Sequence, residues 1–282
     1  MQINDQLRAE ILRNVAVALA EDIGTGDLTA QLIPADRDAR GRVITREHAV
    51  LCGTAWFSAA LTALDPDATV VWHANDGDVI EPGQLLCDVL ASARALLTAE
   101  RTALNFLQLL SATATTTRTF VDAVAGTKAK IVDTRKTLPG LRLAQKYAVA
   151  VGGGTNHRVG LYDGILIKEN HIIAAGSIAK AVETARAIAP SHAFIEVEVE
   201  NIDELRQAIA AGIDMILLDN MSLEEMREAV KVANGRAALE ASGGLDLQSI
   251  RAVADVGVDR ISIGRLTKDV RAIDLSLRHT ER

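Results

Sequence analysis

The second half of the chain alternates short apolar runs with amphipathic stretches. Four apolar runs begin at residues 194, 215, 237 and 260, and a fifth covers 164–170. Their apolar positions are mostly consecutive, as is typical of parallel strands that are covered on both faces. Helix-like stretches lie between them, at 177–189, 202–212, 223–235 and 247–257. A βα unit that recurs in this way predicts a parallel sheet closed into a barrel-like domain, with an open doubly wound sheet as the second choice.

Helix-entry signals support this interpretation. Asn201 is followed three residues later by Glu204, and Ser222 by Glu225, which is the spacing of a capping box. A glycine stands at the end of three of the predicted helices. The count of apolar runs falls short of the eight that a complete (β/α) barrel needs.

The first 107 residues lack this rhythm. We predict an amphipathic helix over about 5–20, β-like runs at 41–53 and 69–90, and a long helix over 92–115. The fold class is therefore α/β, with a smaller N-terminal α/β (α+β) domain at 1–107 and a barrel-like domain at 108–282. The last residues are free to pack back on the first domain.

Composition and charge exclude several classes of function. The chain has 282 residues, 49% of them hydrophobic, and a formal net charge of −7, which argues against nucleic-acid binding. No apolar run approaches the length of a membrane span, and the N-terminus does not resemble a signal peptide, so we expect a cytoplasmic protein. Cys52 and Cys87 lack metal-ligand spacing and are expected to be buried thiols.

Polar residues stand where the predicted strands end, and in a barrel these ends meet at one mouth. Between 133 and 169 there are six Lys and Arg residues against three acids, a positive cluster in an acidic chain. Such a cluster suggests a small substrate with several negative charges, because Arg and Lys pair with carboxylates and phosphates. The cluster includes Arg135, Lys136, Arg158 and Lys168, with His157 beside them.

Glu198 and Asp219 end successive predicted strands, so their carboxylates should lie side by side. Such a pair can bind a divalent cation, accept hydrogen bonds from vicinal hydroxyls or perform acid–base chemistry. Glu196 and Glu200 share a strand face with Glu198, and spacing alone does not choose among the three. The glycines of the last strand ends would let backbone N–H groups approach a phosphate. A phosphorylated sugar beside an acidic substrate fits this combination.

Several longer motifs carry a family resemblance. ERTALNFLQLLSATAT, DTRKTLPGLR, KYAVAVGGGTNHRVGLYDGILIKENHI, EVEVEN, MILLDN, EASGGL and SIGRLT together resemble quinolinate phosphoribosyltransferase (decarboxylating), also called nicotinate-nucleotide pyrophosphorylase, over nearly the whole chain. The resemblance implies a small N-terminal α/β domain, an α/β barrel of fewer than eight strands, and a homodimer or a higher assembly such as a hexamer. It also implies phosphoribosyl transfer from 5-phosphoribosyl 1-pyrophosphate to quinolinate, with loss of CO₂, in NAD biosynthesis.

The same resemblance implies roles for individual residues. Glu198, chosen as the middle glutamate of EVEVE, and Asp219 would bind the ribose hydroxyls and Mg²⁺, directly or through water or substrate. Lys136, Lys168, Glu198 and Asp219 would be catalytic, and Arg101 would reach the site of a neighbouring subunit. The two carboxylates of quinolinate would be held by Arg101, Arg135, Lys136, His157, Arg158 and Lys168, with Thr134 also in contact with substrate. The 5-phosphate would be held by the backbone at Ser242, Gly243, Gly244, Ile263, Gly264 and Arg265.

Three alternatives stay open at this point. A related phosphoribosyltransferase-like protein could use another substrate, although an intact Lys168 argues against it. A Schiff-base barrel aldolase would use Lys168 as its nucleophile. A non-catalytic ligand-binding protein would not need the Glu198–Asp219 pair. We expect small-molecule substrates and self-association, with neither nucleic acid nor membrane as a partner.

Overall fold

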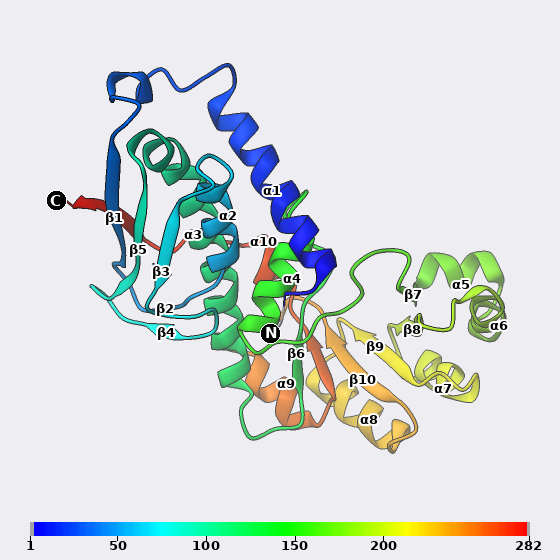
Figure 1. The fold of residues 1–282 in the computed structure, drawn as a ribbon. Coiled ribbons are helices and arrows are strands. Elements are labelled where there is room, and N and C mark those ends of the chain that lie inside the picture. Colours follow the sequence, from blue (N-terminus) through cyan, green and yellow to red (C-terminus); the bar gives the residue numbers. More distant parts are fainter. Residues whose placement is uncertain (1–2, 281–282) are drawn as a thin grey trace. The chain divides into compact units, whose positions relative to one another are not determined.

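The structure is a computed structural model that describes residues 3–280 as two compact units (Figure 1). Unit 1 comprises the chain up to Arg118, Thr137–Gly153 and the chain from Leu266 onward, and unit 2 comprises Thr119–Lys136 and Gly154–Arg265. This division differs from the predicted boundary at residues 107 and 108, whereas the return of the last residues to the first unit is what the prediction allowed. Residue 107 lies inside an unbroken helix, α3 (Ala93–Ala123), and the chain later returns twice to unit 1.

Unit 1 is built on an antiparallel sheet with the strand order β12-β1-β5-β3. Its strands are β1 (Asp38–Thr45), β3 (Thr69–Trp72), β5 (Leu85–Ser92) and β12 (Leu275–Thr280), and a separate pair is formed by β2 (Ala49–Val50) and β4 (Val79–Ile80). The last strand of the chain pairs with the first, with Val43 opposite Leu277. The end of the chain therefore completes the N-terminal sheet.

Helices cover this sheet and enclose its core. They are α1 (Asp5–Ile23), η1 (Ala30–Leu32), α2 (Thr54–Thr62), α3 and α4 (Arg142–Val151), and the short α10 (Arg265–Lys268) begins at the point where the chain re-enters the unit. Trp56 and Phe57 are fully buried, and the ring of Trp56 lies 5.6 Å from that of Tyr147 on α4. The α4 helix is part of this core although it follows unit 2 residues in sequence.

Unit 2 is a parallel sheet with the strand order β6-β11-β10-β9-β8-β7. The strands are β6 (Lys130–Val132), β7 (Gly164–Ile167), β8 (Phe194–Val199), β9 (Met215–Asp219), β10 (Ala238–Ser242) and β11 (Arg260–Ser262). A lone bridge from Val132 to Thr155 extends the β6 edge. This six-stranded, barrel-like sheet confirms the predicted fold class. Buried apolar residues such as Val197, Ile216 and Leu239 explain the continuous apolar runs.

The connecting helices of unit 2 are α5 (Glu169–Ala175), α6 (Ile178–Ile188), α7 (Ile202–Ala210), α8 (Leu223–Ala233) and α9 (Ile250–Val256). Three of them begin at a capping side chain, which is Ser177 for α6, Asn201 for α7 and Ser222 for α8. Ser222 and Glu225 form the complete capping box that we predicted at the start of α8. At α7 the Asn201 side chain accepts from the Glu204 backbone, and the Glu204 carboxylate instead accepts from the backbone of Glu200. Within residues 3–280, no helix has the length and hydropathy that a membrane span would require.

Candidate active site

Thirteen of the fifteen predicted site residues stand at or just beyond the carboxyl ends of the unit 2 strands. Two do not: Arg101 lies in unit 1, and Glu198 is the fifth of six residues within β8. Because all neighbouring strands are parallel, their carboxyl ends lie at one edge of the sheet. The thirteen are Thr134, Arg135, Lys136, His157, Arg158, Lys168, Asp219, Ser242, Gly243, Gly244, Ile263, Gly264 and Arg265. We call this edge the mouth of unit 2.

Two guanidinium groups are brought together at the mouth. Burial and then the positive charge of Arg135 lower the pKa of Arg158, while the carboxylates of Glu196 and Asp163 act in the opposite direction. Arg158 also donates from Nη1 to the carbonyl of Gly164 at 3.0 Å. Two like charges held close together favour a bound anion, which would relieve their repulsion.

The Asp163 carboxylate shapes the loop that carries Arg158. Its two oxygens accept hydrogen bonds from the backbone N–H groups of Val159 and Gly160, at 2.7 and 2.8 Å. These contacts close a tight turn just after Arg158. Asp163 thus fixes the conformation of this loop, a structural role that we did not predict from the sequence.

Lys136 crosses over Gly264 at the β6–β11 corner. A Cβ atom at Gly264 would lie 3.2 Å from Cδ of Lys136 and 3.8 Å from Oγ1 of Thr134. The same Thr134 hydroxyl accepts from the Lys136 backbone N–H at 3.1 Å. Gly264 therefore leaves room for the Lys136 side chain, in addition to any approach of its backbone to a ligand.

Lys168 and Glu198 form an ion pair across the β7–β8 edge. The Lys168 Nζ lies 2.7 Å from Oε2 of Glu198. The lysine is about half exposed, whereas the glutamate is largely buried. The resemblance assigned these residues to different substrates, but in the structure they bind each other, so a substrate carboxylate that pairs with Lys168 would share it with Glu198.

The three glutamates of EVEVE occupy three different depths. Glu196 is fully buried and contacts His157, Glu198 lies near the mouth, and Glu200 is exposed beyond the end of β8. A hydrogen bond with Glu169 raises the pKa of Glu200, and the nearby carboxylates of Glu204 and Asp219 add to the effect. Depth along the strand thus separates residues that alternation alone left equivalent.

Asp219 is oriented by its neighbour Asn220. The Asn220 Nδ2 donates to Oδ2 of Asp219 at 2.9 Å, and its backbone N–H donates to the carbonyl of Ser242 at 3.0 Å. Asn220 has a φ of 54°, a conformation that few residues other than glycine adopt. We did not predict a role for Asn220, and the only signal in the sequence was its place beside Asp219.

The glycine turn after β10 depends on the same asparagine. Gly243 has a φ of 114°, and a Cβ atom there would lie 2.2 Å from Oδ1 of Asn220. At the neighbouring strand end, the backbone N–H of Ile263 donates to the carbonyl of Val132 at 2.9 Å. The N–H of Ile263 is therefore already hydrogen-bonded within the sheet. Of the predicted phosphate-binding backbone, the Gly243–Gly244 turn and the Gly264–Arg265 peptide are the parts that could contact a phosphate.

The backbone of His157 lies at the mouth, but its side chain is buried beneath it. Its Nε2 lies 2.8 Å from Oε2 of Glu196, and its Nδ1 accepts from the backbone N–H of Arg158 at 2.8 Å. The backbone N–H of His157 donates to Asp133, and its ring packs edge-on against Phe194. Both ring nitrogens therefore bind protein groups, which differs from the direct substrate contact that the resemblance implied.

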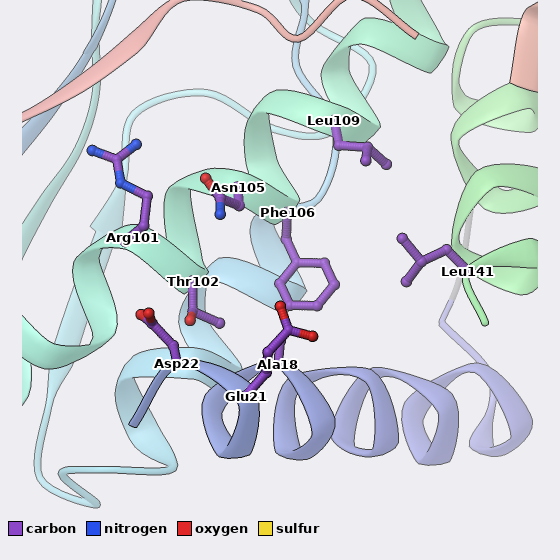
Figure 2. A pocket seen from close by; sticks show the side chains of 9 residues that line it. All are labelled: Ala18, Glu21, Asp22, Arg101, Thr102, Asn105, Phe106, Leu109 and Leu141. Carbon is purple, nitrogen blue, oxygen red and sulfur yellow. The ribbon is translucent and has the colours of Figure 1, made fainter. Parts of the chain in front are cut away.

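Arg101 lies on α3 in unit 1, beside a pocket of about 170 Å³ (Figure 2). The residue is exposed, and among the described residues it has no ion-pair partner, although two acids line the same pocket. Figure 2 shows the side chains from α3 facing those from α1. The lining residues are Ala18, Glu21, Asp22, Arg101, Thr102, Asn105, Phe106, Leu109 and Leu141.

A barrel-like α/β sheet with guanidinium groups, carboxylates and glycine turns at one edge is the arrangement of an α/β-barrel enzyme site, and its cations suit an anionic ligand. Two family models match the chain: quinolinate phosphoribosyl transferase, N-terminal domain, at residues 27–111, and quinolinate phosphoribosyl transferase, C-terminal domain, at 113–278.

Individual relatives agree with these matches. The solved nicotinate-nucleotide pyrophosphorylase from Francisella tularensis is 49% identical, with a TM-score of 0.95 and 99% of each chain covered. The curated nicotinate-nucleotide pyrophosphorylase (carboxylating) of Mycobacterium leprae is 46% identical over 92% of this chain and 94% of its own length. A probable enzyme of the same name from Bacillus subtilis is 44% identical over 91% and 89%.

The chain belongs to the quinolinate phosphoribosyltransferase family, the phosphoribosyltransferases that act on quinolinate in de novo NAD biosynthesis. The family, fold class and activity predicted from the sequence are thereby confirmed.

Proposed function

We propose that the mouth of unit 2 is where this chain joins quinolinate to 5-phosphoribosyl 1-pyrophosphate and releases pyrophosphate and CO₂, leaving nicotinate mononucleotide. The observation that carries the proposal is the gathering of cations at the mouth, where Arg135, Lys136, Arg158 and Lys168 follow the strand ends and the charge of Arg135 acts on Arg158. Such a cluster favours an anionic substrate. Quinolinate brings two carboxylates on adjacent ring positions, which matches a site with two guanidinium groups and the ammonium of Lys168.

The sugar phosphate would lie along the later strands. Glu198 and Asp219 would accept hydrogen bonds from the two ribose hydroxyls, since carboxylates accept from vicinal donors. Gly243 and Gly244, both with positive φ, and the Gly264–Arg265 peptide would face the 5-phosphate. Lys136 lies against Gly264, where its charge would meet the same phosphate group.

The carboxylates also fit Mg²⁺. Asp219 uses only Oδ2 in its bond to Asn220, so Oδ1 can face a cation, and Glu198 binds Lys168 through Oε2 alone. Mg²⁺ is commonly held by one or two carboxylates together with substrate phosphates and water, as these residues would allow. When bound, the ion supplies positive charge that neutralises the departing pyrophosphate.

In the first step, the bond between the ribose C1 and pyrophosphate breaks as the quinolinate nitrogen forms a bond to C1. The cations hold the nitrogen opposite the leaving group, and the Glu198 carboxylate stabilises positive charge that develops on the sugar. In the second step, the carboxylate beside the nitrogen leaves as CO₂. Its electron pair is held next to the pyridinium nitrogen, and a proton takes its place.

The ion pair at Lys168 argues against the aldolase alternative. A Schiff-base lysine must lose its proton to attack a carbonyl, and its pKa is usually lowered by burial or by nearby cations. Lys168 is half exposed and its Nζ lies 2.7 Å from the Glu198 carboxylate, so among the residues described the structure gives it neither the burial nor the cationic neighbour of a Schiff-base lysine.

We further propose that the active assembly contains two or more copies and that Arg101 of one copy completes the mouth of another. An exposed arginine without an ion-pair partner, beside two acids that it does not bind, is available to a second chain. This would add a third guanidinium to the quinolinate site.

The proposal is tested by incubating the purified chain with quinolinate, 5-phosphoribosyl 1-pyrophosphate and Mg²⁺. Nicotinate mononucleotide and CO₂ should form in equal amounts, and both should be lost in a double variant with Arg135→Ala and Arg158→Ala. Formation of product at the wild-type rate by that variant would contradict the placement of the site at the mouth.

A further inference from the structure

A buried polar network lies inside unit 2, below the mouth. His157 contacts Glu196 at 2.8 Å and lies 3.7 Å from Glu240, and Arg260 binds the other oxygen of Glu240 at 2.6 Å. Both glutamates are fully buried, and one oxygen of each, Oε1, has no hydrogen-bond partner. Buried carboxylates are costly to keep, so their presence here calls for a role.

The hydrogen bonds determine the protonation of His157. The backbone N–H of Arg158 points at Nδ1 from 2.8 Å, and an N–H donor requires an acceptor that bears no proton. The neutral ring must then carry its proton on Nε2, which faces Oε2 of Glu196. Glu196 therefore selects the tautomer that carries its proton on Nε2. In that tautomer, the unprotonated Nδ1 can accept the hydrogen bond from the backbone N–H of Arg158.

The same geometry argues against a metal ion in this network. Ligand atoms of His157, Glu196 and Glu240 lie within 4.8 Å of one another, a spacing that a divalent cation could bridge. Coordination through Nε2 would require that nitrogen to lose its proton, and a neutral ring would then carry it on Nδ1. There it would oppose the N–H of Arg158, and Arg260 would add a further repulsive charge.

We propose that Glu196 is a positioning residue for quinolinate, acting through His157 on Arg158. The carboxylate fixes the tautomer and tilt of the imidazole, the imidazole fixes the Arg158 peptide, and the Arg158 guanidinium is thereby held beside Arg135. The inference rests on the role proposed above for Arg158. It also gives His157 a task that needs no direct contact with substrate.

The decisive variant is Glu196→Ala. Without the Glu196 carboxylate as acceptor, the imidazole is free to change tautomer or to rotate. A proton on Nδ1 would then repel the backbone N–H of Arg158. We expect KM for quinolinate to rise about tenfold to a hundredfold, on the scale of one buried hydrogen bond left unmade. KM for 5-phosphoribosyl 1-pyrophosphate should change by less than about threefold, because Glu196 acts through His157 on Arg158, which is assigned to quinolinate, whereas Glu198 and Asp219 are assigned to the phosphoribosyl donor.

Two conservative variants serve as controls. Glu196→Gln retains a carbonyl oxygen that can accept from Nε2, so it should restore KM for quinolinate to within about fivefold of wild type. Glu240→Gln alters the second fully buried carboxylate of the network without removing Glu196, the hydrogen-bond partner of His157, and it should leave both KM values nearly unchanged. Equal increases in both KM values for Glu196→Ala would indicate a general disturbance of the sheet and would overturn the proposal.

A measurement on the wild-type chain does not depend on whether Glu196→Ala folds. In ¹⁵N spectra of histidine-labelled protein, the His157 resonances should show a protonated Nε2 and an unprotonated Nδ1, and the reverse tautomer would refute the inference. Arg158→Ala, assayed in parallel, distinguishes an error in the proposed quinolinate site from an error in the positioning role of Glu196. If it leaves KM for quinolinate unchanged, the proposed site is wrong; if it raises KM and Glu196→Ala does not, only the positioning role fails.

Discussion

The Gly243→Ala substitution would test how the glycine turn and Asp219 depend on each other. A Cβ atom at Gly243 would lie 2.2 Å from Oδ1 and 2.9 Å from Cγ of Asn220, well inside contact distance. Asn220 would have to move, and with it the amide group that donates to Asp219. The φ of 114° at Gly243 is also a conformation that alanine rarely adopts.

The strained backbone at residue 243 and the lost hydrogen bond from Asn220 together determine the expected loss of stability. Placing a non-glycine residue in so rare a conformation costs about 1–3 kcal/mol. Losing the bond from Asn220 to Asp219 adds about 1 kcal/mol, the net value of a typical hydrogen bond. The variant should therefore unfold about 5–15 °C below wild type, at roughly 2–4 °C per kcal/mol for a chain of this size. An unrestrained Asp219 carboxylate should also raise KM for 5-phosphoribosyl 1-pyrophosphate about tenfold.

Gly244→Ala is the matched control. Gly244 also has a positive φ, of 45°, but a Cβ atom there would meet nothing within 4 Å. Its cost should be limited to the left-handed conformation, about 1–2 kcal/mol, with Asn220 undisturbed. Thermal unfolding and initial rates with each substrate varied in turn would compare the two variants. If both lowered stability equally and both left KM for the phosphoribosyl donor unchanged, the coupling through Asn220 would be refuted.

Three further predictions follow from the proposed site. Nicotinate, with one carboxylate, should be used at least about a hundredfold less efficiently than quinolinate, because one cation that the bound substrate covers would lack a carboxylate partner, at a cost of about 2–5 kcal/mol; equal kcat/KM for both would contradict the paired-guanidinium site. Asp219→Asn and Glu198→Gln should weaken calorimetric binding of 5-phosphoribosyl 1-pyrophosphate with Mg²⁺ more than binding of quinolinate, and normal donor binding by both variants would remove their assignment. Arg101→Ala and Lys168→Ala should each be nearly inactive as homodimers, and mixing them should restore about a quarter of wild-type activity if Arg101 crosses a two-fold interface; no recovery after verified subunit exchange would place Arg101 in its own chain's site.

Local patterns were sufficient for most elements of unit 2, although the short α5 helix at Glu169–Ala175 was not predicted. Continuous apolar runs predicted the strands, and residues such as Ser222 and Glu225 marked where helices begin, because these signals act within a few residues of the chain. Parallel strands place their carboxyl ends at one edge, so the convergence of residues such as Arg135 and Asp219 could also be expected. The α4 helix, which carries Lys146 and Tyr147, was not predicted from the KYAVAVGGG segment, and its place in the unit 1 core depends on contacts distant in sequence.

The sequence by itself determined the kinds of side chain at the mouth, their order along the chain and the family to which they belong. Only the tertiary structure decided their depths and partners. Glu196, Glu198 and Glu200 look equivalent in EVEVE, yet burial separates a carboxylate that holds His157 from one that binds Lys168 and one exposed to solvent. The physical reason is that side-chain alternation specifies a face of the strand, whereas position along the barrel axis and contact with other strands arise only when the sheet assembles.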